Sequence, residues 1–253
     1  MNPETTPPTT MIDLIKVSKV YPPNVQALSD ISLTIAKKEV VFLTGASGAG
    51  KTTLLRLISR MEKPTKGMLD VAGMDVIKLS ERDIHLLRRK VGMAYQDFKL
   101  LPERTVADNI AIALEVVYSP RSVIERRVRE LLDQLDLTRK YNTRADELSR
   151  GEQQRVSIAR SVANSPEIIL ADEPTGNLDA ETTARVMALF GHLNSRGATL
   201  LIATHDRSLF QNRPHRIIEL RSGRILSQSE TDENDSNDLF ETAPSLLEEE
   251  VEP

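Results

Sequence analysis

A glycine-rich stretch is the part of this sequence best suited to chemistry. Residues 45–52 read Gly-Ala-Ser-Gly-Ala-Gly-Lys-Thr, and they follow an apolar run at residues 39–44. Glycines let a backbone wrap closely so that its N–H groups face phosphate oxygens, and the start of a following helix adds the positive end of its dipole. The order of apolar strand, loop and helical run therefore predicts a loop that binds the phosphates of a nucleotide.

Each residue of this loop has a predicted role in nucleotide binding. We expect Lys51 to reach the β- and γ-phosphates of ATP, and Thr52 to ligate Mg²⁺ through its hydroxyl. The alternative is a chance glycine-rich turn, which the flanking strand and helix argue against. The candidate nucleotide-binding residues are Gly45, Ala46, Ser47, Gly48, Ala49, Gly50, Lys51, Thr52 and Thr53.

A pair of acidic residues ends a second apolar run. Residues 168–174 read Ile-Ile-Leu-Ala-Asp-Glu-Pro, so Asp172 and Glu173 follow directly on a buried-looking strand. Asp172 would hold Mg²⁺ through water, and Glu173 would orient or deprotonate the attacking water. Alone, an Asp-Glu-Pro sequence is as often a solvated turn. The Asp-Glu-Pro sequence indicates a metal and catalytic site only in combination with the phosphate-binding loop.

Residues 148–155, Leu-Ser-Arg-Gly-Glu-Gln-Gln-Arg, lie shortly before that acidic strand. Their order resembles the signature of the ATP-binding cassette (ABC) family. The resemblance implies that Ser149 and the backbone at Gly151 cap the γ-phosphate held by a second subunit, so that a homodimer binds ATP at its interface. Arg150 stands where the family usually has its first glycine. Its side chain must either point away from the nucleotide or add a positive charge beside it.

Further residues match the family by position. The resemblance implies that Tyr21 stacks on adenine, that Gln96 senses Mg²⁺ and water, and that His205 contacts the γ-phosphate. It also implies that Asp179 lies in the loop that crosses the dimer. Read singly, each match is weak, but their correct order in one chain is hard to produce by chance. A GTPase is disfavoured because the sequence has no Asn-Lys-x-Asp segment.

Residues 172–179 and 151–155 resemble one branch of the family in particular, and within it residues 42–52 and 95–109 look most like the cell-division members. That branch includes lipoprotein-releasing, macrolide-export and cell-division ATPases, and the cell-division members are the most similar. The resemblance implies an ATP-hydrolysing subunit at the cytoplasmic side of the inner membrane. It would bind an integral membrane permease subunit and control cell-wall hydrolases. Two alternatives stay open: a lipoprotein- or drug-exporting ATPase, and a soluble ABC protein that acts on DNA or ribosomes.

The elements that must position these residues follow an α/β pattern. Short apolar runs alternate with helical patterns, which predicts a sheet with buried central strands. The β pattern disappears over residues 98–163, where three helical patterns follow one another. We therefore expect a P-loop NTPase core sheet with N-terminal antiparallel strands and an inserted helical subdomain. The expected core strands cover residues 39–44, 167–171 and 198–203, and the antiparallel strands residues 12–17 and 27–35.

Composition places the domain boundaries. Residues 1–10 and 228–253 have too little apolar content to support packing and are expected to be mobile tails around an ABC domain at residues 11–227. Of the 37 acidic residues, ten lie in residues 228–253, which leaves 27 against 33 Lys and Arg elsewhere. That positive balance forms no concentrated stripe, and aromatic residues make up only 4%, so a nucleic-acid partner is not expected.

Two further expectations concern the surroundings of the protein. The sequence contains no cysteine, which fits a reducing compartment, and it has no apolar run of about 20 residues that could span a bilayer. Membrane association would then need a partner, and docking of a partner helix needs exposed apolar anchors. The candidate anchors follow Gln96, and the alternative is that all of them face the core; they are Phe98, Leu100, Leu101, Val106, Ile110, Ile112, Leu114 and Val117.

Overall fold

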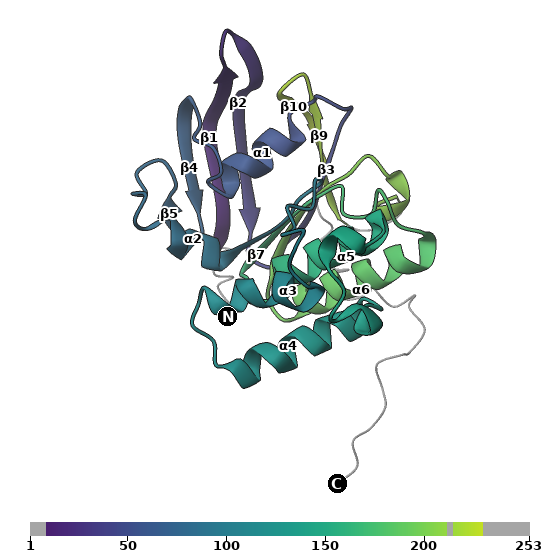
Figure 1. Cartoon of the computed structure of the whole chain (residues 1–253). Coiled ribbons are helices and arrows are strands. Elements are labelled where there is room, and N and C mark those ends of the chain that lie inside the picture. Colours follow the sequence, from purple (N-terminus) through teal and green to yellow (C-terminus); the bar gives the residue numbers. More distant parts are fainter. Residues whose placement is uncertain (1–8, 212–214, 230–253) are drawn as a thin grey trace, which may run out of the picture.

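The computed structural model describes residues 9–211 and 215–229, and Figure 1 shows two β-sheets with helices packed on them. The first sheet is antiparallel, with the order β2 (Val25–Ala36), β1 (Thr10–Tyr21), β4 (Lys66–Val71) and β5 (Met74–Asp75). The second has the order β10 (Arg224–Gln228), β9 (Arg216–Arg221), β3 (Val40–Thr44), β8 (Thr199–Ala203), β7 (Ile168–Asp172) and β6 (Val91–Ala94). The predicted combination of a core sheet with N-terminal antiparallel strands is confirmed.

The core strands are buried on both faces, which explains why their sequences are continuously apolar. In β3, Val41 and Leu43 pack in a cluster with the first sheet and the helix that follows the glycine-rich loop. Val40 and Phe42 point the other way, into a cluster with the helices that follow β6 in the chain. Strands β3, β8, β7 and β6 pair in parallel, so their carboxyl ends lie along one edge of the sheet.

Six α-helices and three short 3₁₀ turns complete the described part of the chain. The α-helices are α1 (Lys51–Ile58), α2 (Ile84–Lys90), α3 (Val106–Glu115), α4 (Arg121–Gln134), α5 (Arg150–Val162) and α6 (Ala180–Ser195). The 3₁₀ turns are η1 (Thr138–Lys140), η2 (Ala145–Glu147) and η3 (Arg207–Leu209). Helices α3, α4 and α5 all fall between β6 and β7, which are paired neighbours, as expected for an insertion into the sheet.

Two helices of the insertion begin at sharply defined residues. The Thr105 side chain accepts a hydrogen bond from the backbone N–H of Asp108, and the Asp108 carboxylate accepts one from the backbone N–H of Thr105. Ser149 and Glu152 form the same pair of bonds at the start of α5. These are complete capping boxes, which satisfy two otherwise unpaired N–H groups per helix. They fix where α5 begins, and that start lies within the predicted signature segment.

The expected tail boundaries are off by one or two residues. Thr10 already belongs to β1, and the carbonyl oxygen of Thr9 accepts a hydrogen bond from the backbone of Lys37. Gln228 is the last residue of β10, and the Ser229 backbone still donates to Ile217. The rest of both expected tails lies outside the described residues.

The expected docking anchors are mostly core residues. Val106, Ile110 and Leu114 are buried between the helices and the second sheet, so these three residues do not provide exposed anchors. The apolar residues of α3 recur with a helical period because one face of the helix packs against the core. Leu101 is the most exposed of the candidate anchors, at 40%. No helix within residues 9–211 and 215–229 is long and apolar enough to cross a membrane.

Candidate nucleotide-binding site

The glycine-rich loop joins β3 to α1 in a backbone conformation that requires glycine. Gly45 has φ +138° and Gly50 has φ +110°, both in the left-handed half that side chains rarely adopt. A Cβ at Gly45 would collide with the carbonyl oxygen of Leu220, and one at Gly50 would lie 2.7 Å from the Leu28 side chain. The loop therefore turns tightly enough to direct its backbone at a ligand, with Gly50 as the residue that starts α1.

A cleft of about 590 Å³ opens at this loop, at the carboxyl ends of the parallel strands. Ligands in open α/β sheets bind at this edge, because the loops that leave the strands meet there. The cleft is lined by Ala27, Ser47, Gly48, Ala49, Gly50, Lys51, Thr52, Thr53, Gln96, Asp172, Glu173, Gly176, Asn177 and His205. The structure thus brings together residues from separate parts of the sequence.

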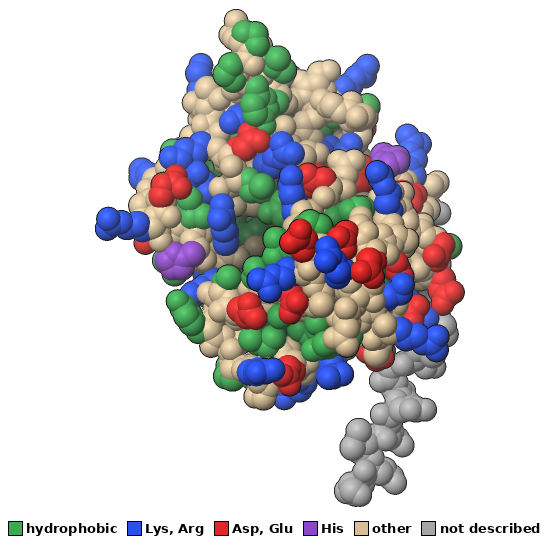
Figure 2. Space-filling model, in the orientation of Figure 1, with side chains coloured by type: hydrophobic (Ala, Val, Ile, Leu, Met, Phe, Trp, Pro, Cys, Tyr) green, Lys and Arg blue, Asp and Glu red, His purple; other side chains and the backbone are tan. Residues whose placement is uncertain are grey.

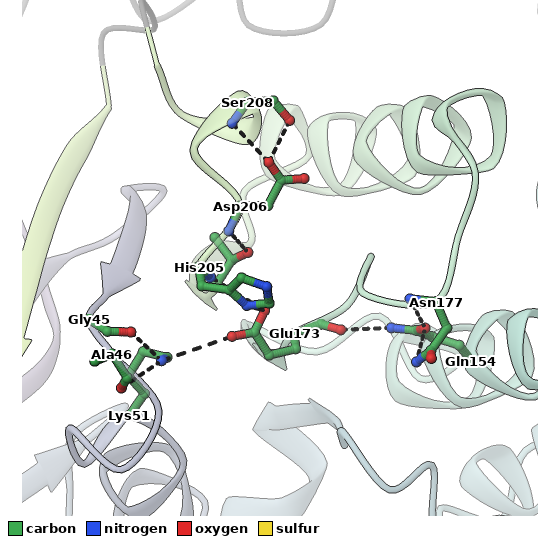
Figure 3. A network of polar contacts seen from close by, with 10 residues as sticks. Gly45, Ala46, Lys51, Gln154, Glu173, Asn177, His205, Asp206 and Ser208 are labelled. Atoms are coloured by element: carbon green, nitrogen blue, oxygen red, sulfur yellow. Dashed lines mark hydrogen bonds and ion pairs between the residues drawn. The ribbon is translucent and has the colours of Figure 1, made fainter.

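Glu173 is the centre of the charged groups in the cleft. Its carboxylate lies 3.9 Å from the ammonium nitrogen of Lys51 and 2.9 Å from Nδ1 of His205. The Lys51 ammonium also donates to the carbonyl oxygens of Gly45 and Ala46, at 2.7 and 3.4 Å. Figure 3 shows the Lys51 and His205 side chains both directed at this carboxylate. A cation, a carboxylate and an imidazole therefore share one small space.

Asp172 is buried beside Glu173 with an unused acceptor. Only 2% of the residue is exposed, and its Oδ1 atom has no hydrogen-bond partner among the described residues. Burial raises the pKa of Asp172 above its usual value; the hydrogen bond with Thr52 opposes this shift, and the charge of Glu173 adds to it. A buried carboxylate oxygen without a partner, next to a threonine hydroxyl, is a set of hard oxygen donors that fits a divalent cation.

The described residues alone do not form a full metal cage. No group of three or more His, Asp or Glu side chains in the described part of the chain could hold an ion. Mg²⁺ in nucleotide sites uses few protein ligands and completes its shell with water and phosphate oxygens. The pairing of Thr52 with Asp172 is consistent with that kind of site.

The backbone of Glu173 is held from both sides. Glu173 has φ +50°, which is unusual for a residue with a side chain. Its N–H donates to the Ala203 carbonyl at 2.8 Å, and its own carbonyl accepts from Nε2 of Gln154 at 2.7 Å. The Gln154 side-chain oxygen in turn accepts from the backbone and side chain of Asn177, at 3.2 and 3.1 Å (Figure 3). These bonds fix where the carboxylate points.

Several of these residues were not predicted from the sequence. Ala27, Gly176 and Asn177 line the cleft, and Gln154 supports it from α5. The available signal for Gln154 was its position on a helix four residues before Ile158, which is buried. A polar residue on the buried face of a helix needs a hydrogen-bond partner.

Six predicted binding residues do not line the cleft. Gly45 and Ala46 lie at the start of the loop, where their carbonyl oxygens accept hydrogen bonds from Lys51. Tyr21 ends β1, where its hydroxyl hydrogen bonds Glu62 and the Lys19 ammonium lies 4.8 Å from its ring centre. Ser149 and Asp179 cap the helices α5 and α6. A Cβ on Gly151 would lie 3.1 Å from the Asn177 carbonyl oxygen. We call Ser149, Arg150, Gly151 and Asp179 the signature surface.

Known proteins are similar to this chain in sequence and fold. The profile of a family described as ABC transporter matches residues 28–176. The chain belongs to this ABC family. Its relatives include the cell division ATP-binding protein FtsE of Bacillus subtilis, 46% identical over 90% of this chain and all of that protein. The FtsE of Escherichia coli (strain K12) is 44% identical over 85% of this chain and 97% of that protein.

The fold agrees with a solved ABC cassette. The dimeric structure of the ATP-binding cassette MJ0796 in a post-hydrolysis state, bound to ADP and Pi, matches with a TM-score of 0.83 and 34% identity. The match covers 87% of this chain and 99% of that cassette. The predictions of an ABC ATPase fold, of ATP hydrolysis and of similarity to cell division ATP-binding proteins are confirmed.

Proposed function

We propose that this ABC ATPase binds MgATP in the cleft of residues 45–53 and hydrolyses it with Glu173 as the group that activates water. The observation that carries the proposal is the convergence of Lys51, Asp172 and Glu173 on one cleft. Lys51 would neutralise the β- and γ-phosphates while the loop N–H groups bind their oxygens. The Glu173 carboxylate, with its backbone fixed by hydrogen bonds, would accept a proton from water attacking the γ-phosphate.

Thr52, Asp172 and Gln96 would hold Mg²⁺. The ion supplies charge neutralisation for the phosphate oxygens when it is bound. Thr52 would offer its hydroxyl, and Asp172 would offer its unpartnered oxygen through a water molecule. Gln96 lines the same cleft two residues after β6, which places its amide between the core sheet and the helical subdomain. His205 would contact the γ-phosphate from the side opposite Lys51.

The signature surface would complete the site of a second copy. Ser149 and Gly151 lie outside their own chain's cleft, at the N-terminal end of α5, where a helix favours an anion. A homodimer with two ATP molecules at its interface would place each signature surface over the other chain's phosphates. The dimeric state of the MJ0796 cassette supports this assembly. Asp179 would then lie at the interface, and Tyr21 would stack on adenine.

The partner would be an integral membrane permease subunit like FtsX. The similarity to FtsE proteins supports a role in cell division, with ATP turnover controlling cell-wall hydrolases across the membrane. The chain would lie at the cytoplasmic side of the inner membrane through that partner. A lipoprotein- or drug-exporting complex is the second candidate, because its ATPase would use the same cleft.

A second cavity is the most suitable place for the partner to dock. It has a volume of about 560 Å³ and lies between α2, β6, α3 and α5. We call it the α2–α3 groove. Val116 in this groove is 62% exposed, and Tyr95 connects the groove to Gln96. The groove is lined by Ser59, Met61, His85, Arg88, Arg89, Val91, Gly92, Met93, Tyr95, Ala113, Val116, Val117, Arg160, Ser161, Asn164 and Pro166.

Co-purification with the membrane subunit tests this function. Val116→Asp should lose capture by an FtsX-like subunit and keep ATP affinity, because the change lies in the groove and outside the cleft. Val25→Asp is the matched control, since Val25 is 60% exposed on β2 and does not line the groove. Equal capture of both folded variants would place the contact elsewhere. Capture by a lipoprotein-releasing or drug-export subunit instead would favour the second candidate.

A further inference from the structure

The α2–α3 groove has an unbalanced charge. Its lining contains the guanidinium groups of Arg88, Arg89 and Arg160 and no Asp or Glu. None of the three arginines forms an ion pair with a carboxylate of the described residues. Arg160 donates instead to the carbonyl oxygens of Phe98 and Lys99, at 2.6 and 2.7 Å, so its positive charge is not neutralised. Like charges gathered in one groove make it attractive to an anionic segment.

The floor of the groove is apolar. Val91 and Met93 of β6 are at most 8% exposed, and Val116 and Met61 are among the most exposed large apolar side chains of the described chain. Figure 2 shows hydrophobic side chains in a hollow in the region of α2 and α3, with both basic and acidic side chains around it. A fitting occupant would therefore combine apolar side chains with carboxylates and carry few positive charges.

The chain contains such a segment in residues 230–253. These 24 residues hold ten acidic side chains and no Lys or Arg. Residues 230–238 have no apolar side chain, whereas residues 239–253 combine five acidic residues with Leu239, Phe240, Leu246, Leu247 and Val251. The sequence is thus divided into a polar spacer and an acidic, apolar end. Too few apolar residues are present to form a core of their own, but they suffice to cover a groove.

The length of the segment allows it to reach the groove. It begins after β10, at one edge of the second sheet, and the groove lies at β6, on the opposite edge. Five strand spacings of about 4.8 Å separate these edges, or about 24 Å. The nine residues of the spacer can extend over about 30 Å. The spacer is therefore long enough for the acidic, apolar end to reach the groove.

We propose that residues 239–253 dock in the α2–α3 groove of their own chain, with carboxylates facing Arg88 and Arg89 and apolar side chains covering Val116 and Met93. Docking of this kind is weak and reversible, because surface charges are screened and the apolar area is small. The segment would occupy the surface proposed for the membrane subunit, so it would hold back partner binding until the subunit displaces it. That regulatory consequence rests on the proposed function, whereas the docking itself does not.

Cross-linking tests the docking directly, and the absence of native cysteine makes it specific. The isolated chain with Val116→Cys and Leu247→Cys should form an intramolecular disulfide under mild oxidation, visible as a faster band on a non-reducing gel. The matched control is Val25→Cys with Leu247→Cys, which should cross-link several-fold less. Equal yields from the two pairs would overturn the docking. A covalent dimer as the main product would overturn docking within one chain and indicate a second copy as the occupant.

Charge reversal supplies the second arm of the test. Arg88→Glu with Arg89→Glu, both at exposed positions, should lower the yield of the Val116–Leu247 cross-link several-fold, and added salt should do the same. An unchanged yield would overturn the role of the arginines. In a separate assay, a chain that ends at Ser229 should capture more membrane subunit than the full chain. Equal capture would overturn the competition, and no capture by either chain would overturn the proposed partnership while the cross-link still decides the docking.

Discussion

The nucleotide cleft and the signature surface differ in how the fold assembles them. In the cleft, residues distant in the sequence converge because parallel strands end at the same edge of the sheet, and their charged groups contact one another. On the signature surface, Ser149 and Asp179 cap their own helices and do not line the cleft of their own chain. The comparison indicates two halves in one chain: a cleft half, in which charged groups converge, and an outward-directed half, whose residues do not line the cleft of their own chain.

Removing the carboxylate proposed to activate water should have the largest effect on the cleft half. Glu173→Gln keeps the shape and the backbone hydrogen bonds of Glu173 but removes the base, so hydrolysis should fall by about 10²- to 10⁴-fold. ATP affinity should stay, because the loop of residues 45–53 is unchanged. Single-turnover hydrolysis and equilibrium ATP binding measure the two separately. Near-normal hydrolysis in this variant, assayed with its membrane partner, would show that another group activates water.

A charge placed on the signature surface should break only the outward-directed half. Ser149→Asp keeps an N-cap acceptor for α5, so the melting temperature should stay, but it sets a carboxylate where a γ-phosphate would bind. ATP should then no longer stabilise a dimer, while each chain still binds ATP. Light scattering in the Glu173→Gln background gives the readout. Ser149→Asn is the matched control, because it caps the helix without a charge. ATP-driven dimers in both variants would contradict the composite site.

The cleft half was more fully predictable from sequence than the rest of the molecule. The glycine-rich loop and the acidic strand end are short segments, and each carries its chemistry in a fixed spacing next to a buried strand. Local sequence therefore predicted Lys51, Asp172 and Glu173 together with the strands that hold them. The antiparallel strands and the helical insertion could also be predicted, because alternation and helical period change along the chain.

Contacts between residues that are distant in the sequence could not be predicted from local sequence patterns. Gln154 and Asn177 are 23 positions apart, and their hydrogen bonds beside the Glu173 backbone depend on how α5 packs near β7. The apolar residues of α3 show a helical period whether their face meets the core or a partner. Only the packed structure separates Ile110, which is buried, from Val116, which is exposed.

The bond between Gln154 and Glu173 links the two halves, and its loss should have an intermediate effect. Gln154 is 3% exposed, so Gln154→Leu would leave the partly buried Glu173 carbonyl without this partner, at a cost of about 1 kcal/mol in the free energy of unfolding. We expect kcat to fall with little change in KM, because the Glu173 carboxylate loses its fixed direction.

Gln154→Glu sharpens this test. The carboxylate can still accept from Asn177, but it has no donor for the Glu173 carbonyl, so kcat should fall here too. Denaturant unfolding and steady-state kinetics give both quantities. If Gln154→Leu unfolds more easily but keeps its kcat, Gln154 supports the fold and does not position Glu173.

Replacing Arg150 should give the smallest effect, and the effect should have opposite signs in the isolated chain and in the ATP-bound dimer. It is exposed at the first position of α5, where the helix dipole disfavours a cation, and no described carboxylate pairs with it. Arg150→Gln should therefore stabilise the isolated chain slightly, by about a few tenths of a kcal/mol. In the ATP-bound dimer the same cation would lie beside the phosphates bound to the other chain, so its removal should weaken the dimer and reduce the dependence of dimerisation on salt.

Thermal unfolding without nucleotide measures the expected stabilisation of the isolated chain. Dimerisation in the Glu173→Gln background at two salt concentrations measures the expected weakening of the dimer. A variant with unchanged ATP-driven dimerisation and salt dependence would show that the Arg150 side chain points away from the nucleotide, and Arg150→Lys, which keeps the charge, should behave like the parent if the cation matters.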